Sequence, residues 1–352
     1  MSASSIHQLI ESCGFCRASE VEELQTMKTG MTNRSYAFFV KGNRYIIRIP
    51  GEGTDRLINR AQEYAVYRAI APLKISETVH YFDPVTGIKI ASYLTDAHVC
   101  DSGNWEKVAK CVAALREFHS SRLYVAHSFD LWERLDFYER LWDGSPSVYR
   151  DYNKTKRAVL SLKQFIDERP KDVCLCHIDA VPDNFLFVHD TNGAEQIKLI
   201  DWEYAGMQDP HLDIAMFIIY AMYDREEAEK LIDLYFINGC DKLTRMKVHC
   251  YIAVSGLVWS NWCEFKRHCG VEFGAYTQRQ YDYAREYSEI FFREYREVFG
   301  RDYVCTYCST CNHYGCGHRP AAAPCDPDDS QTVGHSKWRV HDRYDHRGAS
   351  RE

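Results

Sequence analysis

Two stretches decide the fold of this chain: Cys176-His177-Ile178-Asp179-Ala180-Val181-Pro182-Asp183-Asn184-Phe185-Leu186, and then Leu199-Ile200-Asp201-Trp202-Glu203. Apolar runs at 173–175 and 185–188 flank the first loop and predict short buried strands. A further strand at 197–200 brings Asp201 to its C-terminal end, after a hairpin turn that contains Gly193. Polar residues at fixed spacing occur by chance, but chance does not easily produce this order of strand, polar loop, hairpin and carboxylate.

The spacing of these polar residues is the one that protein kinases use. In those enzymes a catalytic-loop Asp orients the substrate hydroxyl, while the loop Asn and a later Asp hold Mg²⁺ on ATP. Here the loop reads H-x-D-x-x-x-x-N, and I-D-W-E stands in place of D-F-G. This form resembles the small-molecule kinases related to aminoglycoside phosphotransferases and choline kinases. The resemblance implies that Asp179 is the base and that Asn184 and Asp201 bind Mg²⁺, with ATP as phosphoryl donor.

Length and composition are those of an ordinary globular protein. The 352 residues favour two lobes or domains over one, and charged and hydrophobic residues make up 26% and 45% of the chain. No apolar run approaches the ~20 residues of a membrane span. The N-terminus lacks the basic region and apolar core of a secretory signal. We therefore expect a cytoplasmic protein that does not insert into membranes.

The charge distribution bears on the kind of partner. The net charge is −7, and residues 301–352 hold seven Lys/Arg and seven Asp/Glu, so the deficit lies in residues 1–300. A mildly acidic body disfavours nucleic-acid binding and suits a small cationic substrate.

Three groups of cysteines can be told apart. Seven of the 15 lie within apolar segments, where free Cys behaves as a small hydrophobe: Cys100, Cys111, Cys174, Cys176, Cys240, Cys250 and Cys263. Cys13 and Cys16 form a C-x-x-C without a preceding strand, so we interpret them as incidental thiols. The third group could supply the ligands of a Zn²⁺ site: Cys305, Cys308, Cys311, His313, Cys316 and His318. Its spacing fits no standard zinc pattern well, and we expect a disordered tail there.

Residues 1–95 predict a small lobe rich in strands. Strands are expected at 23–28, 35–40, 44–49, 78–82 and 89–93, with a helix at 55–70 that Asp55 could cap. From residue 96 onward the periodicity is helical. Helices are expected at 102–120, 130–143, 150–168, 211–222, 225–238, 242–268 and 276–299.

The predicted fold class is therefore α+β, in the form of a two-lobed protein-kinase-like fold. Its N-lobe, residues 1–95, would be a small antiparallel sheet that binds the nucleotide. Its larger helical C-lobe, residues 96–300, would hold the catalytic loop and the acceptor pocket. Residues 301–352 would form the tail, and the crevice between the lobes is the expected ligand site.

Several N-lobe residues are suited to binding a nucleotide. Gly30 would let backbone approach phosphates, and the Thr32 and Asn33 side chains could donate to them. Choline kinases carry a similar G-M-[ST]-N stretch. Arg48 stands where kinases place the ATP-binding Lys and can hold phosphate bidentately, as in choline kinases. Glu63 would pair with Arg48, although an ordinary surface ion pair is the alternative.

Two further sets of residues complete the predicted site. The hinge against which adenine binds would be formed by the segment from Tyr93 to Thr95. Trp259 and Trp262 lie three residues apart on one helix face. Such a pair is often part of a core, but in choline kinases this helix lines the trimethylammonium pocket, and Trp faces attract quaternary ammonium. Tyr204 and Phe273 resemble further members of that cage.

Residues ~24–300 thus resemble the choline/ethanolamine kinase family, especially the bacterial LicA-like choline kinases. The resemblance implies transfer of the ATP γ-phosphoryl group to the choline hydroxyl, which would give phosphocholine and ADP. Ethanolamine is the first alternative acceptor, followed by an aminoglycoside or thiamine. A catalytically silent ligand-binding relative is the alternative from another class.

Overall fold

The computed structural model describes residues 2–27, 33–51, 54, 57–190 and 192–306. Gly30 and Thr32 of the predicted phosphate loop, the predicted cap Asp55 and the tail segment 308–318 with its candidate zinc ligands lie outside the described residues.

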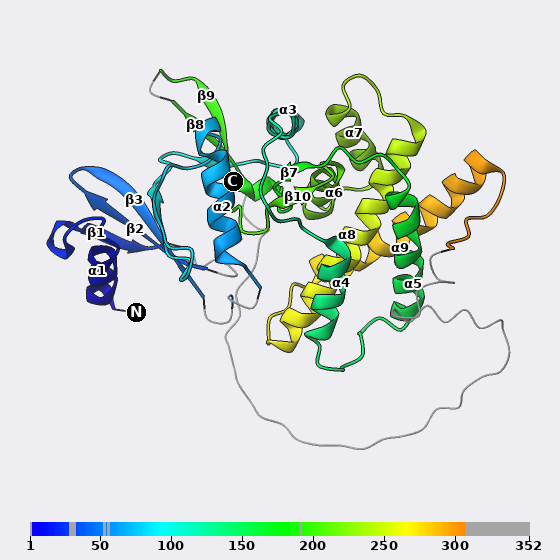
Figure 1. Cartoon of the computed structure of the whole chain (residues 1–352), viewed down its shortest axis with the longest axis horizontal. Helices are drawn as coiled ribbons and strands as arrows, with labels where there is room; N and C mark the ends of the chain where they lie inside the picture. Colours follow the sequence, from blue (N-terminus) through cyan, green and yellow to red (C-terminus); the bar gives the residue numbers. More distant parts are fainter. Residues whose placement is uncertain (1, 28–32, 52–53, 55–56, 191, 307–352) are drawn as a thin grey trace, which may run out of the picture.

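The N-terminal lobe is built on a five-stranded antiparallel sheet in the order β1-β2-β3-β5-β4 (Figure 1). The strands are β1 (Glu22–Thr26), β2 (Asn33–Val40), β3 (Asn43–Pro50), β4 (Val79–Phe82) and β5 (Lys89–Ser92). Helix α1 (Ala3–Ser12) packs Ile6 and Ile10 against Phe38 and Ile47 of the sheet, which gives this lobe a small core of its own. Cys13 and Cys16 follow α1 as free thiols.

Helix α2 (Arg60–Ile70) connects β3 to β4 and begins later than the sequence predicted. Its cap is Asn59, whose side-chain oxygen accepts a hydrogen bond from the Gln62 backbone N–H at 3.2 Å. The prediction of a helix from residue 55 was therefore wrong at its start. Asparagine satisfies an otherwise unpaired N–H at this position, so the helix begins directly after it.

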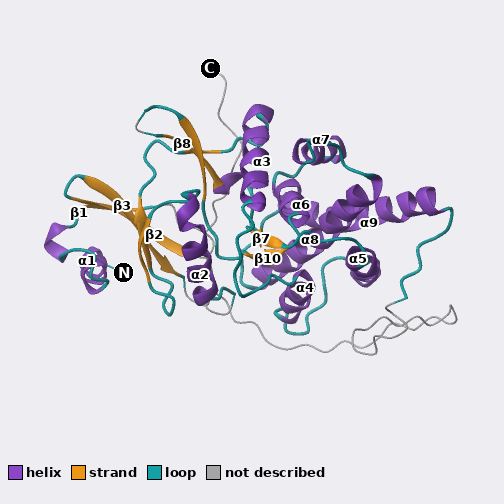
Figure 2. Cartoon of the chain, turned by 45° about the horizontal axis from the view of Figure 1, so that its top comes forward, coloured by secondary structure: helices purple, strands orange, loops and turns teal. Residues whose placement is uncertain are grey.

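The C-terminal lobe is helical and surrounds the long helix α8, as Figures 1 and 2 show. Its helices are α3 (Trp105–Ser120), α4 (Leu131–Arg140), α5 (Tyr152–Asp167), α6 (His211–Tyr220), α7 (Arg225–Tyr235), α8 (Lys242–His268) and α9 (Ala275–Phe299). Helix α8 packs against α4, α5, α6 and α9, and most of its residues are buried. These helices confirm the predicted ones to within a few residues at their ends.

Short strands between the helices carry the residues of the opening motif. Strand β7 (Cys174–Cys176) pairs with β10 (Gly206–Gln208), and β8 (Phe185–His189) lies between β6 (His98–Val99) and β9 (Glu195–Leu199). The catalytic loop therefore leaves β7, and the hairpin β8–β9 leads to Asp201. The sequence did not predict β6 and β10, because two or three residues show no periodicity.

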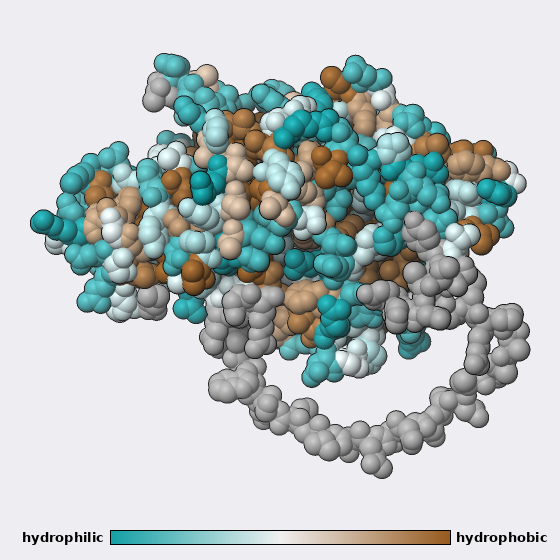
Figure 3. Space-filling model, viewed as in Figure 1, coloured by the Kyte–Doolittle hydropathy of each residue, from teal (hydrophilic) through white to brown (hydrophobic). Residues whose placement is uncertain are grey.

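The arrangement confirms the predicted α+β fold class, with a small antiparallel-sheet lobe beside a larger helical one. On the face shown in Figure 3, hydrophobic side chains are scattered among hydrophilic ones. Within the described ranges, every helix is too short or too polar to traverse a lipid bilayer.

Helices α8 and α9 approach most closely at Gly256. A Cβ atom added there would lie 2.7 Å from the Gln280 carbonyl oxygen, 2.8 Å from the Tyr283 Cβ and 2.9 Å from the Ala284 nitrogen. These are atoms of the α9 backbone or directly attached to it, so a change of side-chain rotamer cannot relieve the clash.

We predict that Gly256→Ala destabilises the protein, although alanine is the better helix former. Helix propensity alone would gain about 1 kcal/mol, whereas overpacking a fixed neighbour costs about 1–3 kcal/mol. Urea unfolding should therefore show a lower free energy of unfolding for Gly256→Ala. The matched control is Gly103→Ala, where the nearest atom is the end of the Asp101 side chain at 3.3 Å. A Gly256→Ala protein as stable as wild type would contradict the tight crossing.

Candidate active site

The catalytic loop leaves β7 through a strained backbone conformation. Ile178, a β-branched residue, has φ +70°, which such residues rarely adopt. The Asp213 carboxylate holds this turn, because it accepts hydrogen bonds from the backbone N–H groups of His177 at 2.8 Å and Ile178 at 2.7 Å. Strain of this kind persists only where the surroundings fix it, and here one buried carboxylate does so.

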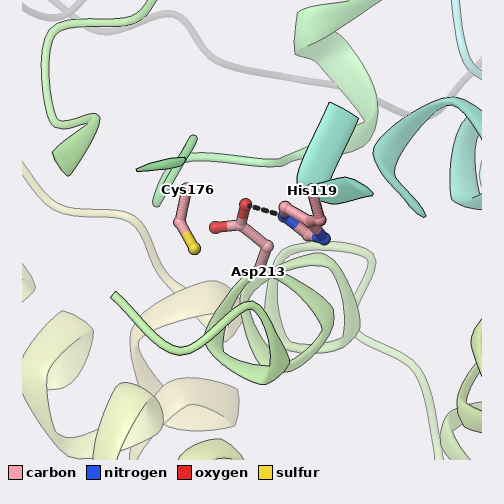
Figure 4. A group of neighbouring side chains, drawn as sticks. All are labelled: His119, Cys176 and Asp213. Carbon is pink, nitrogen blue, oxygen red and sulfur yellow. Dashed lines mark hydrogen bonds and ion pairs between the residues drawn. The ribbon is translucent and has the colours of Figure 1, made fainter. Parts of the chain in front are cut away.

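Asp213 is itself held from the far side by His119 of α3, as Figure 4 shows. The His119 ring lies 2.9 Å from Asp213 Oδ2 through Nε2 and 2.8 Å from the Tyr235 hydroxyl through Nδ1. Cys176 also points toward this carboxylate, so His119, Cys176 and Asp213 have the composition of a metal site. The hydrogen bonds already use both oxygens of Asp213, and we therefore assign the cluster to support of the loop.

His177 connects the catalytic loop to the end of β9. Its Nε2–H donates to the Ile200 carbonyl oxygen at 2.9 Å, and burial lowers the pKa of His177 to about 4. The imidazole is therefore neutral at physiological pH. A neutral ring that donates to backbone braces the loop beside Asp201.

Asp179 and Asn184 lie side by side after this turn. The Asn184 side-chain amide donates to the Asp179 carbonyl oxygen at 2.9 Å and to Asp179 Oδ2 at 3.2 Å. The Oδ1 atom of Asp179 is buried and has no hydrogen-bond partner among the described residues. The Asp179 residue nevertheless lines the cleft.

Three carboxylates face one another at this point: Asp179, Asp201 and Glu203. Burial and then the Glu203 charge raise the pKa of Asp179 to about 7. The same two causes raise the pKa of Asp201 well above its usual range, although its side chain is 37% exposed to the cleft. Like charges held together in poor contact with water favour either protonation or a bound cation. The donor set of carboxylate and amide oxygens fits Mg²⁺.

Arg48 of β3 and Glu63 of α2 form the ion pair that the sequence predicted. Arg48 Nη1 lies 2.6 Å from Glu63 Oε1 and 3.8 Å from Asp201 Oδ1. Burial alone would lower the pKa of Arg48, but the Glu63 charge raises it above its ordinary value. Both side chains are buried, so the alternative of an ordinary surface pair is wrong.

A cleft of about 480 Å³ joins these residues to the segment between the lobes. Ile46 of β3 lines it from the sheet lobe, and Leu186 of β8 and Ile200 line it from the helical lobe. Tyr93 of the predicted hinge also lines the cleft, whereas Thr95 is exposed and lies outside the lining. Apolar walls beside the segment that connects the two lobes suit a flat ring such as a nucleobase.

Aromatic side chains line the part of the same cleft that the helical lobe contributes. Tyr204, Trp259 and Trp262 all reach the cleft, as predicted from the sequence. The rings of Tyr204 and Trp259 meet edge to face, with centroids 6.3 Å apart. Phe273 does not line the cleft: its ring stacks on Trp262, with centroids 5.2 Å apart, and so supports that ring from behind.

Sequence reasoning missed three groups that line the cleft. Tyr220, at the end of α6, accepts a hydrogen bond from the Trp259 indole and lies beside Asp179. Glu203 stands two residues after Asp201, and that D-x-E spacing was a signal that could have revealed it. Lys89 of β5 pairs with Glu77, and only the strand register places it beside Arg48.

Comparison with known proteins agrees with this geometry. The family model for choline/ethanolamine kinase matches residues 24–236. Protein LicA of Haemophilus influenzae is 27% identical over 271 residues, which cover 72% of this chain and 77% of that protein.

Solved structures show the same relationship. The structure of choline kinase LicA from Streptococcus pneumoniae has a TM-score of 0.68 at 29% identity, covering 81% of this chain and 98% of that one. A structure of LicA in complex with AMP has a TM-score of 0.67 at 28% identity and covers 82% and 98%. The family model spans more than half of the sequence, including the catalytic loop and both carboxylates of the D-x-E motif, and the chain therefore belongs to the choline/ethanolamine kinase family.

Proposed function

We propose that this kinase transfers the γ-phosphoryl group of ATP to the hydroxyl of choline, giving phosphocholine and ADP. The observation that carries the choice of acceptor is the aromatic lining of the cleft. Tyr204, Tyr220, Trp259 and Trp262 line the same cavity as Asp179. A small cationic alcohol bound against these rings would have its hydroxyl within the catalytic cleft.

The nucleotide would bind between the sheet lobe and β8. In this pose adenine lies between Ile46 and Leu186 and meets the segment at Tyr93. Arg48, oriented by Glu63, would then hold phosphate oxygens. Asn33 and the loop that contains Gly30 and Thr32 would cover the phosphates, while Thr95 is too exposed to contribute more than the hinge backbone.

Asp179 would act as the base for the acceptor. Its carboxylate, which lines the cleft, would accept the choline hydroxyl proton as the oxygen attacks phosphorus. Asn184 keeps the carboxylate oriented through its two hydrogen bonds. Mg²⁺, held by Asn184 and Asp201, would neutralise charge on the transferring phosphoryl group.

The aromatic walls favour choline over ethanolamine. Trimethylammonium has no N–H group and binds to ring faces, whereas the primary ammonium of ethanolamine needs several hydrogen-bond acceptors. A catalytically silent relative would need no base, yet Asp179, Asn184 and Asp201 are all in place. Measuring ADP release with choline, ethanolamine and aminoglycosides separates these alternatives.

We predict that Trp262→Leu raises the KM for choline by about 2- to 30-fold, since a cation–π contact contributes about 0.5–2 kcal/mol. The KM for ATP should change less than twofold, and Trp262→Phe should retain most of the affinity. Trp259→Ala should act in the same direction. Trp105→Leu is the matched control, because Trp105 stacks on Tyr223 and does not line the cleft. Unchanged choline kinetics in both cleft variants would refute the aromatic pocket.

We predict that Asp179→Asn lowers kcat by about 10²- to 10⁴-fold, the usual contribution of a general base. Asn is similar in size to Asp and can keep the contact with Asn184, so the KM for ATP should stay within a few-fold of wild type. Initial rates of ADP release test this prediction. A variant that turns over at the wild-type rate would exclude Asp179 as the base.

The raised pKa of Asp179 predicts a pH-dependent stability. Between its ordinary pKa and about 7, the unfolded chain ionises this group while the folded protein keeps it protonated. The free energy of unfolding therefore falls as pH rises through that window. In buffer with EDTA, the Tm of Asp179→Asn relative to wild type should increase from pH 5 to pH 8. The control Asp172→Asn removes a carboxyl whose pKa Arg122 lowers, so it should not show this trend. A constant Tm difference would contradict a raised pKa.

A further inference from the structure

Arg60, the first residue of α2, connects four separate parts of the chain. Its Nη1 lies 2.8 Å from Glu63 Oε2 and 3.2 Å from Glu203 Oε2. Its Nη2 donates to the Asn33 side-chain oxygen at 3.3 Å and to the Thr54 hydroxyl at 3.4 Å. The side chain is buried, with 6% of its surface exposed. These four contacts form a junction around the Arg60 guanidinium. They compensate its charge, which would be costly to bury without partners.

Gly87 provides the space through which Arg60 reaches this junction. A Cβ atom on Gly87 would lie 2.6 Å from Arg60 Cδ and 2.8 Å from its Cγ and Nε. Gly87 also has φ +73°, in the turn between β4 and β5. Its carbonyl oxygen accepts from Arg48 Nη2 at 3.5 Å. Gly87 therefore leaves room for the Arg60 side chain and accepts a hydrogen bond from Arg48.

The charges of this junction alternate in sign from one lobe to the other. One carboxylate oxygen of Glu63 pairs with Arg48 and the other pairs with Arg60. Arg48 also pairs with Asp201, and Arg60 also pairs with Glu203. Asp201 and Glu203 are the two acidic residues of the D-x-E motif. Asn33 adds a second contact, since its amide donates to Glu203 at 3.2 Å. Asn33, at the start of β2, and Glu203 of the D-x-E motif thus meet at a single guanidinium.

We propose that Arg60 is a positioning residue that fixes Glu203 and Asn33 relative to each other, so that the phosphate side of the sheet lobe aligns with the catalytic carboxylates of the helical lobe. The proposal rests on the proposed function in taking a nucleotide as the ligand between the lobes. Removing the guanidinium leaves Glu63 and Glu203 with less compensating charge beside Asp201, and the two lobes lose one of the contacts between them. The nucleotide phosphates, which bridge the lobes, would be the first ligand to lose affinity.

The experiment compares Arg60→Met, Arg60→Lys and Gly87→Ala with wild type. Arg68→Met is the matched control, because Arg68 lies on the same helix but is exposed. Calorimetry with ADP and Mg²⁺, without acceptor, measures nucleotide affinity independently of turnover. We expect Arg60→Met and Gly87→Ala to weaken that affinity and raise the KM for ATP by tenfold or more. The KM for choline should change less than threefold, Arg60→Lys should recover part of the loss, and Arg68→Met should match wild type.

Gly87→Ala keeps every charge and displaces the Arg60 side chain, so it tests position apart from charge, although it also strains the turn because Gly87 has φ +73°. If Arg60→Met bound ADP within twofold of Arg68→Met, the proposal would be overturned. It would also be overturned if activity fell only in proportion to the folded fraction, with unchanged KM values, since that is the result of a purely structural role. A wild-type protein that binds ADP but does not act on choline would refute the proposed acceptor alone, and the comparison of ADP affinities would still decide the role of Arg60.

Discussion

The site depends on one buried carboxylate, that of Asp213. By accepting two backbone N–H groups of the loop after β7, it holds Ile178 in a conformation that a β-branched residue would otherwise avoid. His119 fixes the same carboxylate from α3. The direction of Asp179, the contact with Asn184 and the bracing by His177 all follow from this turn. A residue that never reaches the cleft therefore determines where the reactive groups point.

The second constraint is the repulsion among the negatively charged carboxylates that lie close together beside this turn. Burial, and after it the Glu203 charge, raises the pKa values of Asp179 and Asp201. The sheet lobe supplies positive charge through Arg48 and Arg60, both of which form ion pairs with Glu63. Arg48 also lies near Asp201, and Arg60 pairs with Glu203, so two ion pairs join the lobes beside the site.

Sequence reasoning succeeded where the signal was local. The H-x-D-x-x-x-x-N loop, the later Asp201 and the amphipathic helices of the C-lobe were all visible, because fixed spacing and periodicity survive in a single sequence. Trp259 and Trp262 were found for the same reason. The start of α2 was misplaced, since capping by Asn59 outweighed the apolar pattern that precedes it. Tyr220 and Lys89 were missed because long-range packing alone brings them to the cleft, and Arg60 was missed because the same kind of packing brings it to Glu203. Phe273 was predicted for the pocket wall although it lies behind Trp262.

The β4–β5 hairpin, which turns at Gly87, and the β8–β9 hairpin differ in how well they would accept inserted residues. The β8–β9 hairpin turns at Gly193, where an added Cβ would meet no atom within 4 Å, and a loop of this kind accepts inserted residues at little cost. The β4–β5 hairpin has an equally ordinary glycine turn, but its backbone forms one wall of the channel for Arg48 and Arg60. A tag, a linker or a natural insertion at that turn would move the arginines that face the active site. Insertions and deletions among related chains should therefore be common in the β8–β9 hairpin and rare in the β4–β5 hairpin.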